Sequence, residues 1–212
     1  MNSVLPFNFI LPPCRNGFTL IEVLISITLL TIVLGAVYGS FFSVQRALSR
    51  FDAISLKYHE TRTALDIIRR EIESSVLKNF RTDDDEGKLG FIIGDRDLFG
   101  KNTSLLNLTA FSFRGSALNT VSYFVREKEG QFDLVKSEAP AAAPEKEYTV
   151  EIIEGIEAFT VETLFNNKWV RTWDTTTTGR LPETVRVSIE FDDNGKTVKL
   201  TEYAKPIIGT HL

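Results

Sequence analysis

The first pattern along the chain is an uninterrupted apolar stretch. No charged side chain occurs from Val23 to Val44. A helix rises 1.5 Å per residue, so this stretch would cover roughly 30 Å, the thickness of the hydrocarbon core of a bilayer. We therefore predict a membrane-spanning helix. A buried helix of a soluble protein is the weaker alternative, because such helices seldom run this long without a charge.

Beyond this stretch, apolar residues recur at three- and four-residue steps, which is the pattern of an amphipathic helix. The stripe consists of Phe51, Ile54, Tyr58, Leu65, Ile68, Ile72 and Val76, with Thr61 in one slot. Charges four residues apart lie outside the stripe, as Arg62 with Asp66, Asp66 with Arg70, and Arg69 with Glu73. The pattern predicts one helix from about Phe18 to about Leu77, with a second half whose apolar face a folded domain must cover.

After an acidic turn at 81–88 the period changes to two, which indicates strands. About nine short antiparallel strands are expected, joined by hairpin turns at Glu129–Gly130, Asn166–Asn167 and Asn194–Gly195. The segments 137–147 and 175–182 are predicted to be loops. The alternation of Val185, Val187, Ile189 and Phe191 is typical of a strand with one buried face. The fold class is therefore α+β.

Composition narrows the possible chemistry. The chain has 212 residues and a net charge of -4. It therefore lacks the excess of basic residues that is typical of proteins that bind nucleic acid. The only cysteine is Cys14, and His59 and His211 are isolated. No phosphate-binding loop or nucleophile motif is present. We expect no catalytic residue, no metal site, no cofactor and no enzymatic activity, although a membrane-anchored enzyme stays open as an alternative. Trp169 and Trp173 are candidates for a partner-facing patch or for core.

Glu22 is unexpected because it stands at the start of the apolar stretch, in the sequence "RNGFTLIEVL". A carboxylate in hydrocarbon costs at least a few kcal/mol, so it needs a partner. The alternative is that its side chain reaches up to the headgroups. The polar break "RNG" precedes the apolar stretch, which is the reverse of the order in a secretory signal peptide. Flanking charge does not decide the orientation, since Arg15 lies before the stretch and Arg46 and Arg50 lie after it.

The segment "GFTLIEVL", from Gly17 to Leu24, resembles the processing motif of type IV prepilins and type II secretion pseudopilins. The resemblance implies that a cytoplasmic-side peptidase cuts after Gly17 and N-methylates Phe18, the new N-terminus. The leader then lies inside and the residues after about 45 lie in the periplasm. It also implies an assembly role for Glu22, whose partner would be the amine of Phe18 in the same or a neighbouring subunit.

The segments "ALDIIRREIESSV" (64–76), "GIEAFTVETLFNNKWVRTW" (155–173) and "LPETVRVSIEF" (181–191) are similar to the J-type minor pseudopilins of type II secretion. This family implies a pilin-like fold, in which a long N-terminal helix packs on an antiparallel β domain of two small sheets. The parts would be a cleaved leader (1–17), a membrane and assembly half of the helix (18–45), an amphipathic half (46–80) and a periplasmic domain (81–212).

The same resemblance implies a function in protein export. The J subunit would join I- and K-type subunits in a pseudopilus tip complex that initiates assembly, alongside the major pseudopilin and the inner-membrane assembly platform. The alternative is a minor pilin of a type IV pilus, serving adhesion, motility or DNA uptake. Many such pilins close a C-terminal loop with a disulfide, which a cleaved product without cysteine cannot form.

Overall fold

The computed structural model describes residues 17–77, 90–98, 100–111 and 117–207. Within these ranges one long helix, α1 (Leu20–Glu73), is followed by a β domain. The chain divides into two compact units between Asp52 and Ala53, inside α1. The predicted acidic turn at 81–88 and residues 1–16 of the leader lie outside the described residues.

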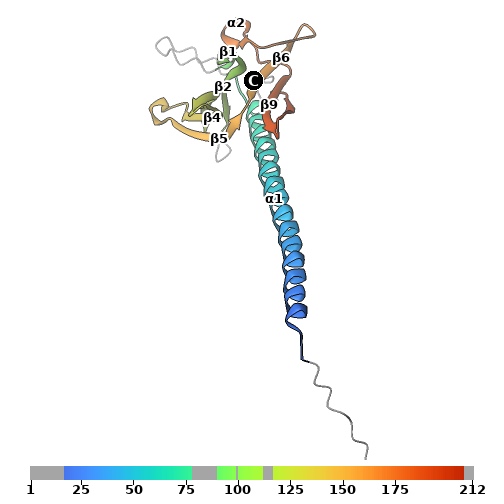
Figure 1. Cartoon of the computed structure of the whole chain (residues 1–212). Helices are drawn as coiled ribbons and strands as arrows, with labels where there is room; N and C mark the ends of the chain where they lie inside the picture. Colours follow the sequence, from blue (N-terminus) through green and yellow to red (C-terminus); the bar gives the residue numbers. More distant parts are fainter. Residues whose placement is uncertain (1–16, 78–89, 99, 112–116, 208–212) are drawn as a thin grey trace, which may run out of the picture. The chain divides into compact units, whose positions relative to one another are not determined.

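The β domain contains ten strands and two short helices (Figure 1). In chain order these are β1 (Phe91–Leu98), β2 (Lys101–Phe111), β3 (Leu118–Lys128), β4 (Gln131–Pro140), η1 (Pro144–Lys146), β5 (Tyr148–Ile156), β6 (Ala158–Phe165), β7 (Lys168–Val170), β8 (Trp173–Asp174), α2 (Thr175–Thr178), β9 (Val185–Asp193) and β10 (Lys196–Ala204). The segment 168–173, which follows the predicted turn at Asn166–Asn167, is split into two strands because β7 pairs with β6 while β8 pairs with β1.

The strands form one sheet with the order β10-β9-β6-β2-β3-β4-β5, and β1 lies against β2. Two antiparallel groups make up this sheet, β1 to β5 with β8, and β6, β7, β9 and β10. They meet where β2 runs parallel to β6, with Thr103 opposite Phe159. The Val161 amide donates to Ser104 Oγ at 3.0 Å beside this junction. The two predicted sheets are thus joined by a parallel pair that the sequence pattern did not indicate.

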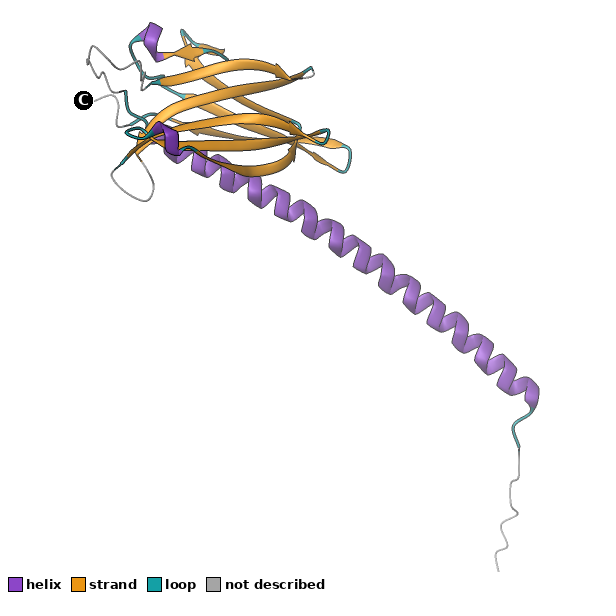
Figure 2. Cartoon of the chain, turned by 90° about the vertical axis from the view of Figure 1, so that its left-hand side faces the viewer, coloured by secondary structure: helices purple, strands orange, loops and turns teal. Residues whose placement is uncertain are grey.

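The last turns of α1 lie along one face of the sheet (Figure 2). Ala64, Leu65, Ile68 and Ile72 are buried there, in one cluster with residues from both strand groups. Tyr58 continues the stripe and packs edge-on against Phe191, with ring centroids 5.1 Å apart. Truncating a fully buried side chain such as Ile68 to Ala costs about 2–5 kcal/mol, so this stripe fixes the helix on the sheet. The stripe is therefore confirmed over this part of the helix.

Three boundaries differ from the prediction. The helix begins at Leu20 and ends at Glu73 rather than at about Leu77. It ends because Ser75 forms a bridge with Ala110 and the Val76 amide donates to a strand carbonyl at 2.9 Å. At the other end of the stripe, Phe51 is exposed.

The predicted loops are also partly ordered. Residues 137–140 continue β4, because they pair with the start of β3, and the loop after them contains η1. The predicted loop 175–182 begins with α2, whose N-cap Asp174 accepts a hydrogen bond from the Thr176 amide at 2.7 Å. Such caps satisfy amides that have no partner inside the helix.

Candidate functional sites at the helix start and on the β domain

The helix start holds the three residues assigned to processing and assembly. Gly17 and Phe18 precede α1 and are exposed, and Glu22 is exposed in the first turn. The Glu22 amide donates to the carbonyl oxygen and to Oγ1 of Thr19, at 3.1 and 3.4 Å, so Thr19 caps the helix. The bond after Gly17 therefore lies in non-helical chain, and the Glu22 carboxylate lies at the helix end where a negative charge is favoured.

Three hydroxyl side chains in the first half of the apolar stretch are hydrogen-bonded within the helix itself. Ser26, Thr28 and Thr31 each donate to the carbonyl four residues earlier, at 2.7, 2.8 and 2.8 Å. These bonds remove the cost of placing free hydroxyl groups in hydrocarbon. By length and composition, α1 is apolar enough to cross a membrane.

Charged residues on the solvent side of α1 form one network around Asp66. Arg69 contacts Asp66 at 2.6 Å and Glu73 at 2.8 Å, and Arg70 contacts Asp66 at 2.9 Å. The Arg69 hydrogen bond holds the pKa of Asp66 below its ordinary value. Two of the three predicted pairs are confirmed, while Asp66 is paired with Arg69 and Arg70 rather than with Arg62.

A second polar group, which we name the Glu71 cluster, lies between α1 and the strands β3 and β4. It consists of Glu71, Tyr123, Lys136, Glu138 and Asn119. Lys136 Nζ lies 2.6 Å from Glu71 Oε1 and 2.8 Å from Glu138 Oε2. The Tyr123 hydroxyl donates to Glu71 Oε2 at 2.5 Å, and the Asn119 amide donates to Glu138. The cluster thus ties one point of the helix to two neighbouring strands.

Burial and pairing shift the pKa values within the Glu71 cluster. Burial, with the Glu71 carboxylate beside it, raises the pKa of Tyr123 well above its ordinary value. Burial alone would lower the pKa of Lys136 and raise that of Glu138. The hydrogen bond between these two residues acts in the opposite sense, and with the other partners it leaves the pKa of Lys136 raised and that of Glu138 lowered. The charged forms of Lys136 and Glu138 are therefore stabilised in the folded protein.

The Glu71 cluster was not predicted from the sequence, although one signal was present. Lys136 and Glu138 alternate with Leu134, so strand period puts all three on one face. A charge on a face that also carries a buried Leu needs a partner. Which residue supplies that partner depends on how the helix packs, and the sequence does not give this.

The two tryptophans do not form one patch. Trp173 is buried, packs edge-on against Phe165 with centroids 5.7 Å apart, and donates its indole N–H to the Arg180 carbonyl at 3.2 Å. Trp169 is only partly buried, and the Arg186 guanidinium lies 4.2 Å from the centre of one of its rings. Of the two, only Trp169 is available at the surface.

Within the described ranges, no three or more His, Cys, Asp or Glu side chains lie close enough together to hold a metal ion. His59 is exposed on α1, and Cys14 and His211 lie outside the described residues.

Comparisons with known proteins agree with the motif at the helix start. The model of the prokaryotic N-terminal methylation motif matches residues 13–38. A search of curated proteins gave no match. Among solved structures, a chain of the GspK-GspI-GspJ complex from the type 2 secretion system of enterotoxigenic Escherichia coli is similar, with a TM-score of 0.49 and 12% identity. The match covers 70% of this chain and 96% of that chain.

The remaining match covers most of the β domain as well as part of the helix. The model of the type II secretion system protein J family matches residues 39–202, which is more than half of the chain. It includes the amphipathic part of α1, strands β1 to β9, and β10 as far as Glu202. The chain therefore belongs to the type II secretion system protein J family, the J-type minor pseudopilins.

Proposed function

We propose that this chain joins I- and K-type minor pseudopilins in a complex at the tip of the pseudopilus, and that this complex helps to initiate pseudopilus assembly. The family match over residues 39–202 carries the proposal. The assembled pseudopilus would then support the export of folded proteins across the outer membrane. The major pseudopilin and the inner-membrane assembly platform are further proposed partners.

The proposed location is the inner membrane, with a single span and the β domain in the periplasm. The uncharged stretch from Val23 to Val44 supports the span, since its length matches the hydrocarbon core. The hydroxyl groups of Ser26, Thr28 and Thr31 are bonded to the helix backbone, so these three side chains are satisfied within the span. The periplasmic side follows from the processing of such chains by a peptidase on the cytoplasmic side.

Processing is proposed to occur between Gly17 and Phe18, followed by N-methylation of Phe18. The match to the methylation motif supports this assignment. The geometry supports it as well, because both residues are exposed and the helix begins only at Leu20. A peptidase that binds extended substrate can reach this bond without unwinding α1.

Glu22 is proposed to pair with the positively charged amine of Phe18 that cleavage creates. The pair would form within one subunit or with a neighbouring subunit. In the second case, the pair would fix the position of each subunit relative to its neighbour during assembly. Moving a carboxylate into hydrocarbon costs about 2.5–3.5 kcal/mol at the centre of a membrane helix. Completing the pair offsets this cost, so a subunit leaves the membrane more readily when a neighbour supplies the amine.

We propose no enzymatic activity for the β domain. Its role is to contact other subunits, and the buried stripe of α1 together with the Glu71 cluster holds the helix in a fixed position for that purpose. This assignment is supported by the family match and by the position of the Glu71 cluster between α1 and the sheet.

Copurification tests the proposed membership. The full chain, carrying an affinity tag after Leu212, is extracted in mild detergent from cells that also produce I-, J- and K-type subunits. Stoichiometric recovery of the I- and K-type subunits is expected. Recovery of type IV pilus subunits in their place would overturn the proposal, and an unrelated membrane protein with the same tag is the control.

A further inference from the structure

Two arginines follow directly after the apolar stretch of α1. Arg46 and Arg50 are four residues apart and both exposed, so they lie on one face of the helix. Between Glu22 and Asp52 the sequence contains no carboxylate, so none stands three or four residues from either arginine. Two like charges at this spacing repel each other, and an anion from outside the helix would relieve the repulsion.

Neither arginine has an anionic partner in the described part of the chain. Arg46 Nε donates to the Phe42 carbonyl at 3.2 Å, a bond within the helix. Arg50 forms no hydrogen bond or ion pair with the residues that the structure describes. Asp52 is two residues from Arg50, a spacing at which side chains on a helix do not face each other. Both guanidinium groups are therefore available to an external anion.

The position of the two arginines along α1 matches the level of lipid headgroups. With Val44 at the edge of the hydrocarbon core, helical rise places them about 3 and about 9 Å beyond it, and the headgroup region is roughly 5–7 Å deep. Side chains on a helix point back toward its N-terminus, which here is toward the membrane. The bond from Arg46 to Phe42 has this direction. The guanidinium groups can therefore reach the phosphates.

Aromatic side chains continue the same row toward the centre of the span. Tyr38 and Phe42 precede Arg46 and Arg50 at the same four-residue step, and the row covers about a third of the helix circumference. The exposed fractions of Tyr38 and Phe42 are 60% and 55%. Tyrosine is enriched where a span meets the headgroups. One face of α1 thus presents aromatic surface for acyl chains, followed by two cations.

Membrane topology does not account for these cations. Under the proposed processing the mature chain begins at Phe18, and no Lys or Arg stands between Phe18 and Val44. Basic residues that flank a span are usually concentrated on its cytoplasmic side. Arg46 and Arg50 lie on the opposite side in the proposed orientation, so they act against it. Another role is needed to explain them.

We infer that Arg46 and Arg50 bind the phosphate of one anionic phospholipid in the periplasmic leaflet, with Tyr38 and Phe42 against its acyl chains. Guanidinium groups bind phosphate oxygens through charge-assisted hydrogen bonds, often in pairs. The choice of leaflet rests on the proposed orientation, whereas the binding does not. Binding can be measured without the other subunits, so its absence would be distinct from a failure of the proposed function.

Native mass spectrometry of the full chain in an uncharged detergent measures lipid binding. Phosphatidylglycerol, which carries a net negative charge, is compared with zwitterionic phosphatidylcholine of the same acyl chains. We expect one phosphatidylglycerol to bind at least about fivefold more strongly, because each basic side chain near an anionic lipid contributes roughly that factor. Equal binding of the two lipids would overturn the inference.

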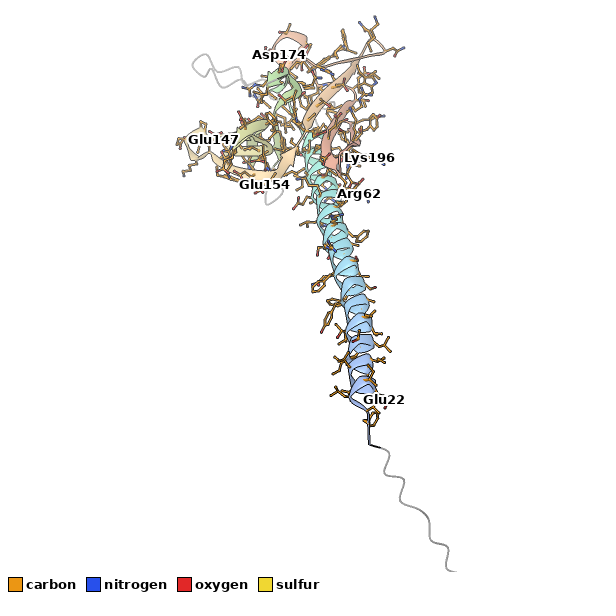
Figure 3. All side chains as sticks on the ribbon, in the orientation of Figure 1. Glu22, Arg62, Glu147, Glu154, Asp174 and Lys196 are labelled. Atoms are coloured by element: carbon orange, nitrogen blue, oxygen red, sulfur yellow. The ribbon has the colours of Figure 1, made fainter. Side chains whose placement is uncertain are left out.

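A double variant and a matched control locate the site. Arg46→Gln combined with Arg50→Gln should remove the preference and leave binding of phosphatidylcholine unchanged. Arg62→Gln is the control, because Arg62 is exposed on the same helix about 24 Å beyond Arg46 (Figure 3). The control should keep the full preference. A preference that survives in the double variant, or that is lost in the control, would show attraction to net charge and contradict the inference.

A carboxylate of a neighbouring subunit is the competing occupant, since it too would satisfy two unpaired arginines. In that case the wild-type chain would bind both lipids equally. The double variant would then lose the I- and K-type subunits on copurification. This combination of results would overturn the inference and assign Arg46 and Arg50 to a contact between subunits.

Discussion

At the scale of single residues, Glu22 is the one for which the physical argument is strongest. Its carboxylate is exposed in the first turn of α1, and its backbone amide is satisfied by Thr19. The only contribution of its charge to helix stability is the modest benefit of a negative charge at a helix N-terminus, about 0.3–1 kcal/mol. When the helix start is surrounded by hydrocarbon or by other helices, the carboxylate needs a partner, and the amine of Phe18 can supply it.

Replacing Glu22 tests this role. Glu22→Ala should leave the β domain folded, and it should lower recovery of the I- and K-type subunits by at least about tenfold, since a few kcal/mol of pairing would be lost. Mass spectrometry of the mature N-terminus reports cleavage and methylation separately. Thr28→Ala, which removes a hydroxyl that bonds only within the helix, is the matched control. Wild-type recovery with the Glu22 variant would contradict the assembly role.

Lys136 is the central residue of the Glu71 cluster. Its side chain has a relative exposure of 14%, and it lies between two carboxylates. Without its charge, Glu71 and Glu138 would face each other partly buried and unpaired. Removing one partner of a buried ion pair costs more than the pair itself contributes, because the remaining charge stays desolvated.

Lys136→Met should therefore lower the free energy of unfolding by about 3 kcal/mol, as measured by chemical denaturation of the full chain in detergent. Lys199→Met is the matched control. Lys199 also pairs with a carboxylate, Glu190, at 3.0 Å, but it is half exposed and should contribute less than about 1 kcal/mol. Equal effects of the two variants would show that the Glu71 cluster has no special role in holding the helix on the sheet.

At the scale of elements, the sequence predicted those features whose geometry depends only on neighbouring residues. All three hairpin turns occur as predicted, with positive φ at Glu129, Gly130, Asn194 and Gly195 and at the Asn166–Asn167 pair. The end of α1 and the extension of β4 to Pro140 were not predicted. Both depend on pairing with distant strands, as when Ser75 bridges to Ala110. Such pairing overrides the composition of a short segment.

The Asn194–Gly195 turn allows a direct test of this local control. Gly195 has a φ of 82°, so Gly195→Ala should destabilise the domain by about 1–2 kcal/mol. Gly94 in β1 is the control, since a Cβ there would meet the Leu105 Cβ at 3.7 Å, an ordinary contact. Gly94→Ala should be neutral or slightly stabilising in the same denaturation experiment. Similar stability of both variants would show that the turn conformation does not set the cost.

At the scale of the whole molecule, the apolar stretch and the motif around Gly17 made the family recognisable from sequence. The helix, the α+β class and most strands followed from periodicity. The order of the strands did not, because contacts such as Thr103 with Phe159 join residues far apart in the chain. The Glu71 cluster was missed for the same reason, since its members come from one helix and two strands.

The export of a secreted protein tests the central claim most directly. In a strain that lacks this chain but retains the other secretion components, we expect a folded cargo of the type II system to accumulate in the periplasm. Export should return when the full chain is supplied. Normal export from the deletion strain, with a loss of pilus-dependent motility or DNA uptake instead, would contradict the account.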